Sequence, residues 1–190
     1  MAFLEKMGTT ADHCIFTNIL QDQEYTDPLE QLAGIIIAGS GDQSLTNEYR
    51  WFSSVAALLK KAFHLNIPIL GICFGHQLLA MLHGAQVVHD VNQRELGTVD
   101  ITLGKDALAE PLFRGIDPGF SAIAGHNDSV VDLTPALHVL ASNETCGVQA
   151  FKVADKPIYG VQFHPELTEH DYQKRLTYYR DYYASHNDSY

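Results

Sequence analysis

The sequence predicts an α/β protein whose sheet is mainly parallel, is flanked by helices on both faces and carries a β-rich extension. Residues 34–38 and 66–70 are short apolar runs that read as buried strands, and each run leads into a glycine-containing turn. A helical pattern follows each turn, over residues 46–63 and 77–82, and such alternation is typical of parallel sheets. After residue 85 the chain changes to short β segments, which predict the extension.

The other elements are predicted from local patterns. We expect a short helix over residues 1–8, a strand over 13–17 and a short connecting helix over 27–31. The β segments of the extension are expected at residues 86–89, 97–103, 120–124, 129–132, 137–142 and 147–153. A strand over residues 157–163 and a tyrosine-rich helix over roughly 169–186 follow them.

The bulk composition narrows the classes of function. With 190 residues the chain is expected to form one domain, residues 1–190, with a full core. A formal net charge of −11, with no basic run, argues against nucleic acid or an anionic membrane as a partner. The three cysteines, at positions 14, 73 and 146, do not make a disulfide framework, and no signal peptide or membrane-spanning apolar run is recognised. We therefore expect a cytoplasmic protein.

Gly71-Ile72-Cys73-Phe74-Gly75 places one cysteine between an apolar strand and a helix. Glycines two residues before and after it give the Gly-x-Cys-x-Gly form of a nucleophile elbow, in which the reactive residue occupies a strained turn among small neighbours. The first N–H groups of the following helix would stabilise a thiolate and, later, an oxyanion. A buried structural cysteine is the alternative, but the paired glycines favour a nucleophile.

A thiolate nucleophile needs a base, and the base needs a third group that holds its tautomer. A histidine with a carboxylate two residues later occurs in His126-Asn127-Asp128 and in His164-Pro165-Glu166. Residues i and i+2 of an extended segment point the same way, so either carboxylate could orient its own imidazole. The second pair follows an apolar strand, and active sites of open α/β sheets lie at the carboxyl ends of strands, where Cys73 also lies. We therefore expect His164 and Glu166 to act with Cys73, and the loop of His126 to contact substrate.

The segment Gly39-Ser40-Gly41-Asp42 follows the strand at 34–38. It could be a simple tight turn, or an oxyanion-hole loop whose backbone N–H groups converge on a developing negative charge. A phosphate-binding loop is the third possibility, but the first basic residue that follows is Arg50.

Taken in order, these segments resemble class I glutamine amidotransferases. Gly71-Ile72-Cys73-Phe74-Gly75-His76-Gln77 is similar to the nucleophile motif of that family, and Gly160-Val161-Gln162-Phe163-His164-Pro165-Glu166 is similar to its His-Glu motif. Within the family, three further segments most resemble GMP synthetase amidotransferase domains and their stand-alone relatives: Arg94-Glu95-Leu96-Gly97, Gly125-His126-Asn127-Asp128 and Gly147-Val148-Gln149-Ala150-Phe151.

The resemblance implies a three-layer α/β sandwich of flavodoxin-like type and hydrolysis of glutamine through a γ-glutamyl thioester. It assigns Cys73, His164 and Glu166 to the catalytic triad. It places the oxyanion on backbone N–H groups near Gly39 and Ser40 and at Phe74, and the amino-acid end of the substrate on Gln77 and the backbone of Asn127 and Asp128. The implied chemistry needs no metal and no cofactor.

Three departures from the family pattern keep other functions open. Gly39-Ser40-Gly41 stands where the family usually has Gly-Gly-Pro, and Gly-Ser versions are typical of relatives that work alone or on γ-glutamyl compounds, so a γ-glutamyl peptide hydrolase or transferase is one alternative. The chain begins inside or just before the first helix of the family pattern, so the family's first strand is not recognised: the sheet lacks it, another segment fills its place, or the sequence given is shortened. A sheet without this strand makes a non-catalytic regulatory or binding module the second alternative. No synthetase domain lies within residues 1–190, so the expected partner is a separate ATP-dependent synthetase subunit.

Overall fold

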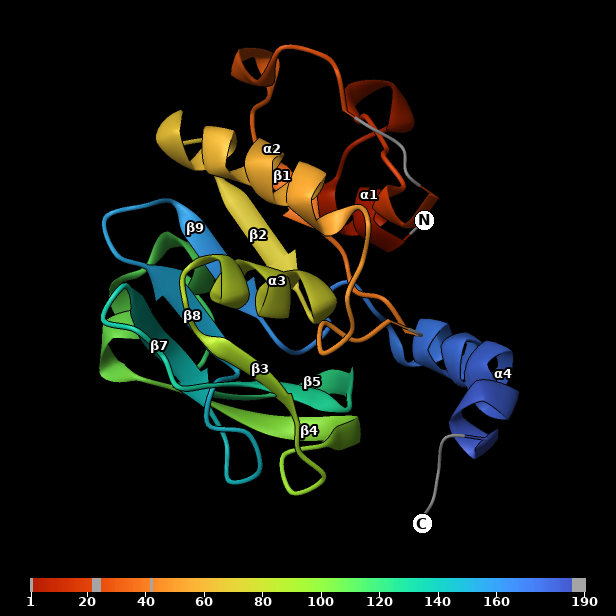
Figure 1. The fold of residues 1–190 in the computed structure, drawn as a ribbon. Coiled ribbons are helices and arrows are strands. Elements are labelled where there is room, and N and C mark those ends of the chain that lie inside the picture. Colours follow the sequence, from red (N-terminus) through yellow and green to blue (C-terminus); the bar gives the residue numbers. More distant parts are fainter. Residues whose placement is uncertain (1, 22–24, 42, 186–190) are drawn as a thin grey trace.

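A computed structural model describes residues 2–21, 25–41 and 43–185 of the chain (Figure 1). Its main feature is a seven-stranded sheet with the strand order β1-β2-β9-β8-β7-β4-β5. The bounds of these strands are β1 Ile35–Ile37, β2 Ile69–Ile72, β4 Glu95–Leu103, β5 Gly119–His126, β7 Leu137–Ser142, β8 Ala150–Val153 and β9 Ile158–Val161. Strands β3 (Gln86–His89) and β6 (Asp128–Val131) form a separate antiparallel pair.

The α/β class is confirmed, and the direction of the strands changes at β9. Strands β1, β2 and β9 pair in parallel, as the apolar runs in the sequence predict. Strands β8, β7, β4 and β5 then join antiparallel. The β-rich part is therefore not a separate extension, because most of it continues the same sheet. The antiparallel part of the sheet is larger than the sequence pattern suggested.

Helices cover both faces of the sheet. The α-helices of the described residues are α1 Ala2–Met7, α2 Phe52–His64, α3 Phe74–Leu82 and α4 Glu169–Ser185. Short 3₁₀ helices span Ala11–His13 (η1), Ile19–Gln21 (η2), Leu29–Gln31 (η3), Lys105–Ala109 (η4) and Pro111–Phe113 (η5). Helices α2 and α3 pack on one face through residues such as Leu59 and Leu78. The other face is covered by η4 and η5 and by Phe3 of α1. This layering matches the expected sandwich.

Two sequence predictions about local structure are wrong. Residues 13–17 do not form a strand: after η1 the chain is irregular, and the side chains of Ile15 and Phe16 are 60% and 67% exposed. Extended backbone needs a neighbouring strand to accept its hydrogen bonds, and β1, the edge strand, pairs only with β2 among the described residues. Helix α2 begins at Phe52 rather than residue 46, because Tyr49 and Ser44 hydrogen-bond each other across a turn.

In the described part of the chain, β1 is the first strand. Strand β1 lies at the edge of the sheet, next to the strand that leads to Cys73. Within the same residues, no helix is both long enough and apolar enough to cross a membrane.

Candidate active site

Cys73 occupies the sharp corner between β2 and α3 that the glycine pattern predicts. Its backbone has φ +51° and ψ −103°, a conformation that L-residues rarely adopt. The corner closes only because both flanking glycines lack a side chain. A Cβ at Gly71 would collide with the carbonyl oxygen of Gly75, and a Cβ at Gly75 would collide with the carbonyl oxygen of Ile37 in β1. Strand, corner and helix are therefore fixed tightly against one another.

His164 lies at the end of the segment that follows β9, and Glu166 orients its ring. The Nδ1–H group of His164 donates a hydrogen bond of 2.7 Å to Oε1 of Glu166, and both side chains are buried. This bond places the other ring nitrogen, Nε2, on the far side of the imidazole. The i, i+2 spacing of the two residues thus produces the predicted histidine–carboxylate pair.

Gly39 shows how close Cys73 and His164 lie. A Cβ at Gly39 would be 3.3 Å from Cβ of Cys73 and 2.8 Å from Cε1 of His164. The thiol of Cys73 donates to the carbonyl oxygen of Gly125 at 3.7 Å. The three predicted catalytic residues, together with Gly39, therefore meet at the carboxyl ends of parallel strands, where the sequence analysis expected them.

The electrostatics of the pair favour a charged imidazole. Burial lowers the pKa of His164, but the charge of Cys73 and then the hydrogen bond and charge of Glu166 outweigh burial and raise the pKa to about 9. An imidazolium at neutral pH is the partner that a thiolate nucleophile needs, and it holds the proton that a departing amine would take.

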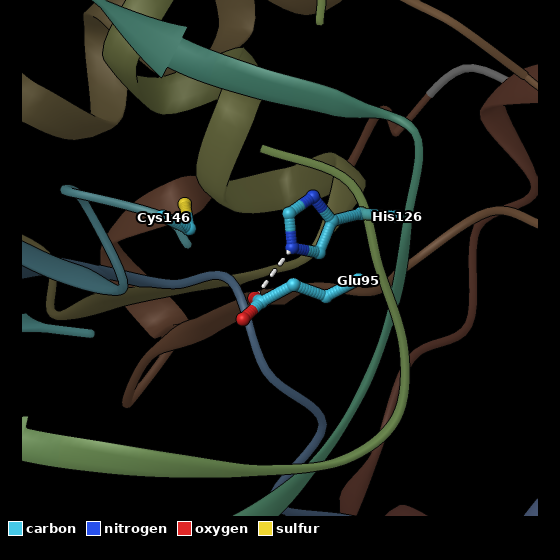
Figure 2. A group of neighbouring side chains, drawn as sticks. All are labelled: Glu95, His126 and Cys146. Carbon is cyan, nitrogen blue, oxygen red and sulfur yellow. Dashed lines mark hydrogen bonds and ion pairs between the residues drawn. The ribbon is translucent and has the colours of Figure 1, made fainter. Parts of the chain in front are cut away.

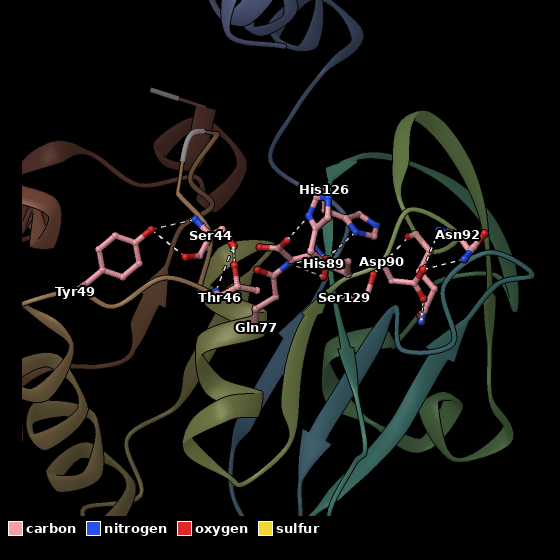
Figure 3. A network of polar contacts seen from close by, with 12 residues as sticks. Ser44, Thr46, Tyr49, Gln77, His89, Asp90, Asn92, His126 and Ser129 are labelled. Atoms are coloured by element: carbon pink, nitrogen blue, oxygen red, sulfur yellow. Dashed lines mark hydrogen bonds and ion pairs between the residues drawn. The ribbon is translucent and has the colours of Figure 1, made fainter. Parts of the chain in front are cut away.

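The remaining predicted residues surround this centre. Phe74 is the first residue of α3 and its buried ring packs on Trp51, which fixes the helix N-terminus beside Cys73. Ser40 follows Gly39 in the half-buried loop after β1. Gln77 is buried in α3, and its side-chain amide donates to the backbone carbonyl of Asp128 at 2.8 Å (Figure 3). Asn127 lies between β5 and β6, so the structure brings all nine predicted residues to one region.

The second histidine–carboxylate pair of the sequence is not formed. The carboxylate of Asp128 accepts a hydrogen bond from Nδ1 of His89 at 3.0 Å, and His126 contacts only the backbone carbonyl of Asp128. The side-chain partner of His126 is Glu95, with 2.9 Å between Nε2 and Oε2. The i, i+2 rule fails here because β5 ends at His126 and β6 starts at Asp128, so the two residues are not on one strand.

Sequence spacing missed a buried polar cluster around Glu95. His126, Gln149 and Asn143 all donate to its carboxylate, and Cys146 lies beside it (Figure 2). Burial raises the pKa of Glu95, but the hydrogen bonds from His126, Asn143 and Gln149 outweigh burial and lower it below the usual value. The members come from distant positions. Glu95, His126 and Gln149 lie in the segments Arg94–Gly97, Gly125–Asp128 and Gly147–Phe151 on which the family resemblance rests, whereas Asn143 and Cys146 lie outside them.

Glu95, His126 and Cys146 also place one potential metal-ligand atom each within 4.8 Å of the others. Both oxygens of Glu95 already accept hydrogen bonds from side-chain donors. The observed arrangement is therefore that of a hydrogen-bonded network, with Nε2 of His126 directed at the carboxylate rather than at an ion.

Space around the centre is limited. The side chains of Cys73 and His164 are 3% and 2% exposed. A small hollow beside His164 is closed by Leu167 and by Tyr172 and Leu176 of α4. A second hollow, of about 490 Å³, lies between residues 25–30 and the end of α2, and none of the predicted site residues lines it.

Comparison with known proteins agrees with the fold and the motifs. The family profile described as "Glutamine amidotransferase class-I" matches residues 7–180, and the chain belongs to this family. It is 38% identical over 152 residues to a subunit of the glutamine-hydrolyzing GMP synthase of Thermococcus kodakarensis, an alignment that covers 76% of each chain. It is 37% identical over 150 residues to the corresponding GMP synthase subunit from Pyrococcus abyssi, again covering 76% of each chain.

A solved structure of a glutamine amidotransferase from Thermotoga maritima superposes with a TM-score of 0.81. The match covers 98% of this chain and 78% of that one, at 21% identity. At this level of identity the similarity concerns the fold alone, and it supports the layered α/β architecture.

Proposed function

We propose that Cys73, His164 and Glu166 hydrolyse the side-chain amide of glutamine to glutamate and ammonia. The observation that carries the proposal is the meeting of a strained, buried cysteine with a histidine whose ring is oriented by a carboxylate. Membership of the class I glutamine amidotransferases supplies the substrate class.

The geometry supports a two-step reaction. The thiolate of Cys73 attacks the amide carbon of glutamine, and the bond to nitrogen breaks as the imidazolium of His164 gives its proton to the departing ammonia. A γ-glutamyl thioester remains. Neutral His164 then takes a proton from water, the resulting hydroxide equivalent cleaves the thioester, and glutamate leaves as the thiolate–imidazolium pair is restored.

The backbone around Cys73 supports the charge that develops on the amide oxygen. Phe74 is the first residue of α3, so its backbone N–H group lies at the N-terminus of this helix. The loop at Gly39 and Ser40 lies against Cys73 and His164. Donors fixed in this way stabilise an oxyanion without reorganising. We assign the amino-acid end of glutamine to the backbone of Asn127 and Asp128, which Gln77 supports through its hydrogen bond to the Asp128 carbonyl.

The relatives that are subunits of glutamine-hydrolyzing GMP synthases suggest where the ammonia goes. We propose that this chain is the glutaminase component of a two-subunit GMP synthase and passes ammonia to a separate ATP-dependent synthetase subunit. The alternative, a stand-alone hydrolase or transferase of γ-glutamyl peptides, is favoured by one observation, the Gly39-Ser40-Gly41 sequence of the loop.

Purified protein incubated with glutamine tests the proposal. We expect glutamate and ammonia in equal amounts, faster release in the presence of a GMP synthetase subunit, and a covalent adduct on Cys73 with a glutamine-shaped chloroketone. The variants Cys73→Ser and His164→Ala should retain the fold and lose turnover. Faster turnover of γ-glutamyl dipeptides than of glutamine would favour the alternative, and absence of both turnover and adduct would refute an enzymatic role.

A further inference from the structure

Asn127 is the single residue between two sheets, and a hydrogen-bonded pair holds each side of it. On one side, Glu95, the first residue of β4, pairs with His126, the last residue of β5. On the other side, His89 and Asp128 are paired at the start of β6, and their side chains also bond. Figure 3 shows His126 and His89 in one network of polar contacts. The path of the chain at residue 127 is thus set by its neighbours.

The Glu95–His126 pair is the buried one of the two. The side chains of Glu95 and His126 are 4% and 1% exposed, whereas that of His89 is 57% exposed. His126 uses both ring nitrogens: Nε2 lies 2.9 Å from the Glu95 carboxylate, and Nδ1 lies 3.0 Å from the backbone carbonyl of Asp128. Both partners are acceptors, so the ring links the carboxylate directly to the backbone beyond Asn127.

Strand β5, which ends at His126, also contacts the proposed catalytic residues. The backbone N–H of His164 donates to the carbonyl of Ile123 in β5 at 2.7 Å, and the thiol of Cys73 faces the carbonyl of Gly125. The Asp128 carbonyl receives the side-chain amide of Gln77 as well as Nδ1 of His126. Strand β5 therefore connects the catalytic centre to the junction, and Glu95 ties down its end.

We propose that Glu95 is a positioning residue, which acts through His126 to hold the Asn127–Asp128 backbone where it binds the amino-acid end of glutamine. This inference rests on the proposed glutaminase function and adds a specificity-determining role to a residue that touches neither the triad nor the substrate. The positioning role predicts that a change at Glu95 weakens glutamine binding but leaves the reactivity of the Cys73 thiol unaltered, because the Glu95–His126 pair contacts the junction and not Cys73.

The variant Glu95→Gln tests the role with almost no change in shape. Three donors converge on the Glu95 carboxylate, from His126, Asn143 and Gln149, so an amide at this position sets an N–H group against another N–H group. We expect KM for glutamine to rise about tenfold or more, since small displacements of a binding group have large effects. The rate of Cys73 alkylation by iodoacetamide should change less than about twofold, because the triad is untouched.

The matched control is Glu110→Gln. The carboxylate of Glu110 also accepts hydrogen bonds from half-buried donors, Lys152 and Tyr159, but it follows η4 on the other face of the sheet and is not at the junction. We expect this isosteric loss of charge to leave KM for glutamine and the alkylation rate at wild-type values. An equal rise of KM in both variants would show a general effect of destabilisation and would overturn the proposal.

A second substitution keeps the test valid if Glu95→Gln folds poorly. Asn143 donates to Oε1 of Glu95, and its own side-chain oxygen accepts from the backbone N–H groups of Thr145 and Cys146. In the double variant Glu95→Gln/Asn143→Asp, the new amide can donate to the new carboxylate and still accept from His126 and Gln149. We expect the double variant to recover folding and most of the lost affinity for glutamine.

The variant Cys146→Ser separates positioning from metal binding. A metal held by Glu95, His126 and Cys146 would need the thiolate, whereas the hydrogen-bonded pair does not use it. We expect unchanged KM in Cys146→Ser and in wild-type enzyme treated with a chelator. A raised KM in both would overturn the proposal in favour of a metal site.

The two proposals fail in different ways. Wild-type protein that never hydrolyses glutamine, with or without a synthetase subunit, refutes the proposed function. An active Glu95→Gln enzyme with unchanged KM, or one whose KM is not restored by Asn143→Asp, refutes only the positioning role.

Discussion

The backbone at Cys73 stores strain where the chemistry needs a projecting sulfur. A non-glycine residue at φ +51° costs on the order of 1–3 kcal/mol and persists only where the surroundings enforce it. Gly71 and Gly75 make it possible here, because a Cβ at either position would collide with a backbone carbonyl oxygen. The corner that holds the Cys73 sulfur therefore requires both glycines of the motif.

At Gly39, one methyl group should remove activity without unfolding the protein. The Cβ of Gly39→Ala would lie 2.8 Å from Cε1 of His164, so the ring must rotate away from Cys73. We expect kcat to fall about 100-fold, since misplacement of a catalytic group by about 1 Å has effects of this size. Steady-state kinetics and thermal unfolding of the same sample check this, and a variant with wild-type kcat would contradict the placement of Gly39 in the centre.

The protonation state of the His164 imidazole determines the pH dependence that we expect for activity. Because its pKa is raised from 6.5 to about 9, the imidazolium persists through neutral pH and loses its proton near pH 9. We expect thioester formation to slow as pH rises through about 9, because departing ammonia no longer receives that proton. The same interactions stabilise the fold fully below pH 6.5, and their contribution is lost between pH 6.5 and about 9.

Replacing the sulfur checks the cause of this raised pKa. Cys73 contributes most to raising the pKa of His164, so an NMR titration of Cys73→Ser should show a lower value than the wild type. An identical value in the two proteins would show that Glu166 alone sets the charge of the ring.

Residue patterns led to the proposed triad because its three members carry local signatures. Cys73 has its two glycines, and His164 and Glu166 are two residues apart in an extended segment. Glu95 carries no such signature, since its partners His126, Asn143 and Gln149 are brought to it by strand pairing over long sequence separations. Contacts of this kind follow from the order of strands in the sheet, which periodicity does not encode.

At the scale of elements, apolar runs and glycine turns located most helices and strands but misjudged those that depend on a neighbour. The segment 13–17 has strand-forming residues, yet it has no strand beside it in the described structure. Helix α2 starts late because hydrogen bonds between Ser44 and Tyr49 stabilise a turn in place of the first helical residues. In neither place did local propensity decide the structure, because one segment lacks a pairing strand and the other is held in a turn.

The contact of α3 with β1 makes Gly75 a position that tolerates no side chain. A Cβ at residue 75 would collide with the carbonyl group of Ile37, which is backbone and cannot rotate away. We expect Gly75→Ala to lower the free energy of unfolding by about 1–3 kcal/mol, the usual cost of overpacking, and to impair activity through the displaced elbow. Urea denaturation checks this.

Gly147→Ala is the control for that measurement. Nothing lies within 4 Å of a Cβ at this position, so we expect a change within about 0.5 kcal/mol. Equal destabilisation by both substitutions would mean that loss of glycine as such, and not the collision with β1, is responsible.

Across the whole molecule, the sheet separates two apolar cores, and the catalytic centre lies where they approach. Phe74 belongs to the core under α2 and α3, while Cys73 and Phe163 belong to the core on the opposite face. The overall architecture could be predicted from the family motifs and from the change, after residue 85, from alternating strands and helices to short β segments. The turn from parallel to antiparallel pairing at β9 could not, because the short β segments of the sequence do not show which neighbour each will take.

The edge position of β1 has a consequence for how copies of the chain behave in concentrated solution. Three successive isoleucines line this strand, Ile36 is 39% exposed, and neither proline nor charge interrupts them. Unpaired backbone groups on such a strand are a template for adding foreign β-structure. We expect Ile36→Lys to reduce self-association in sedimentation measurements while glutamine turnover stays constant. If self-association is unchanged, copies of the chain must contact one another through a surface other than β1.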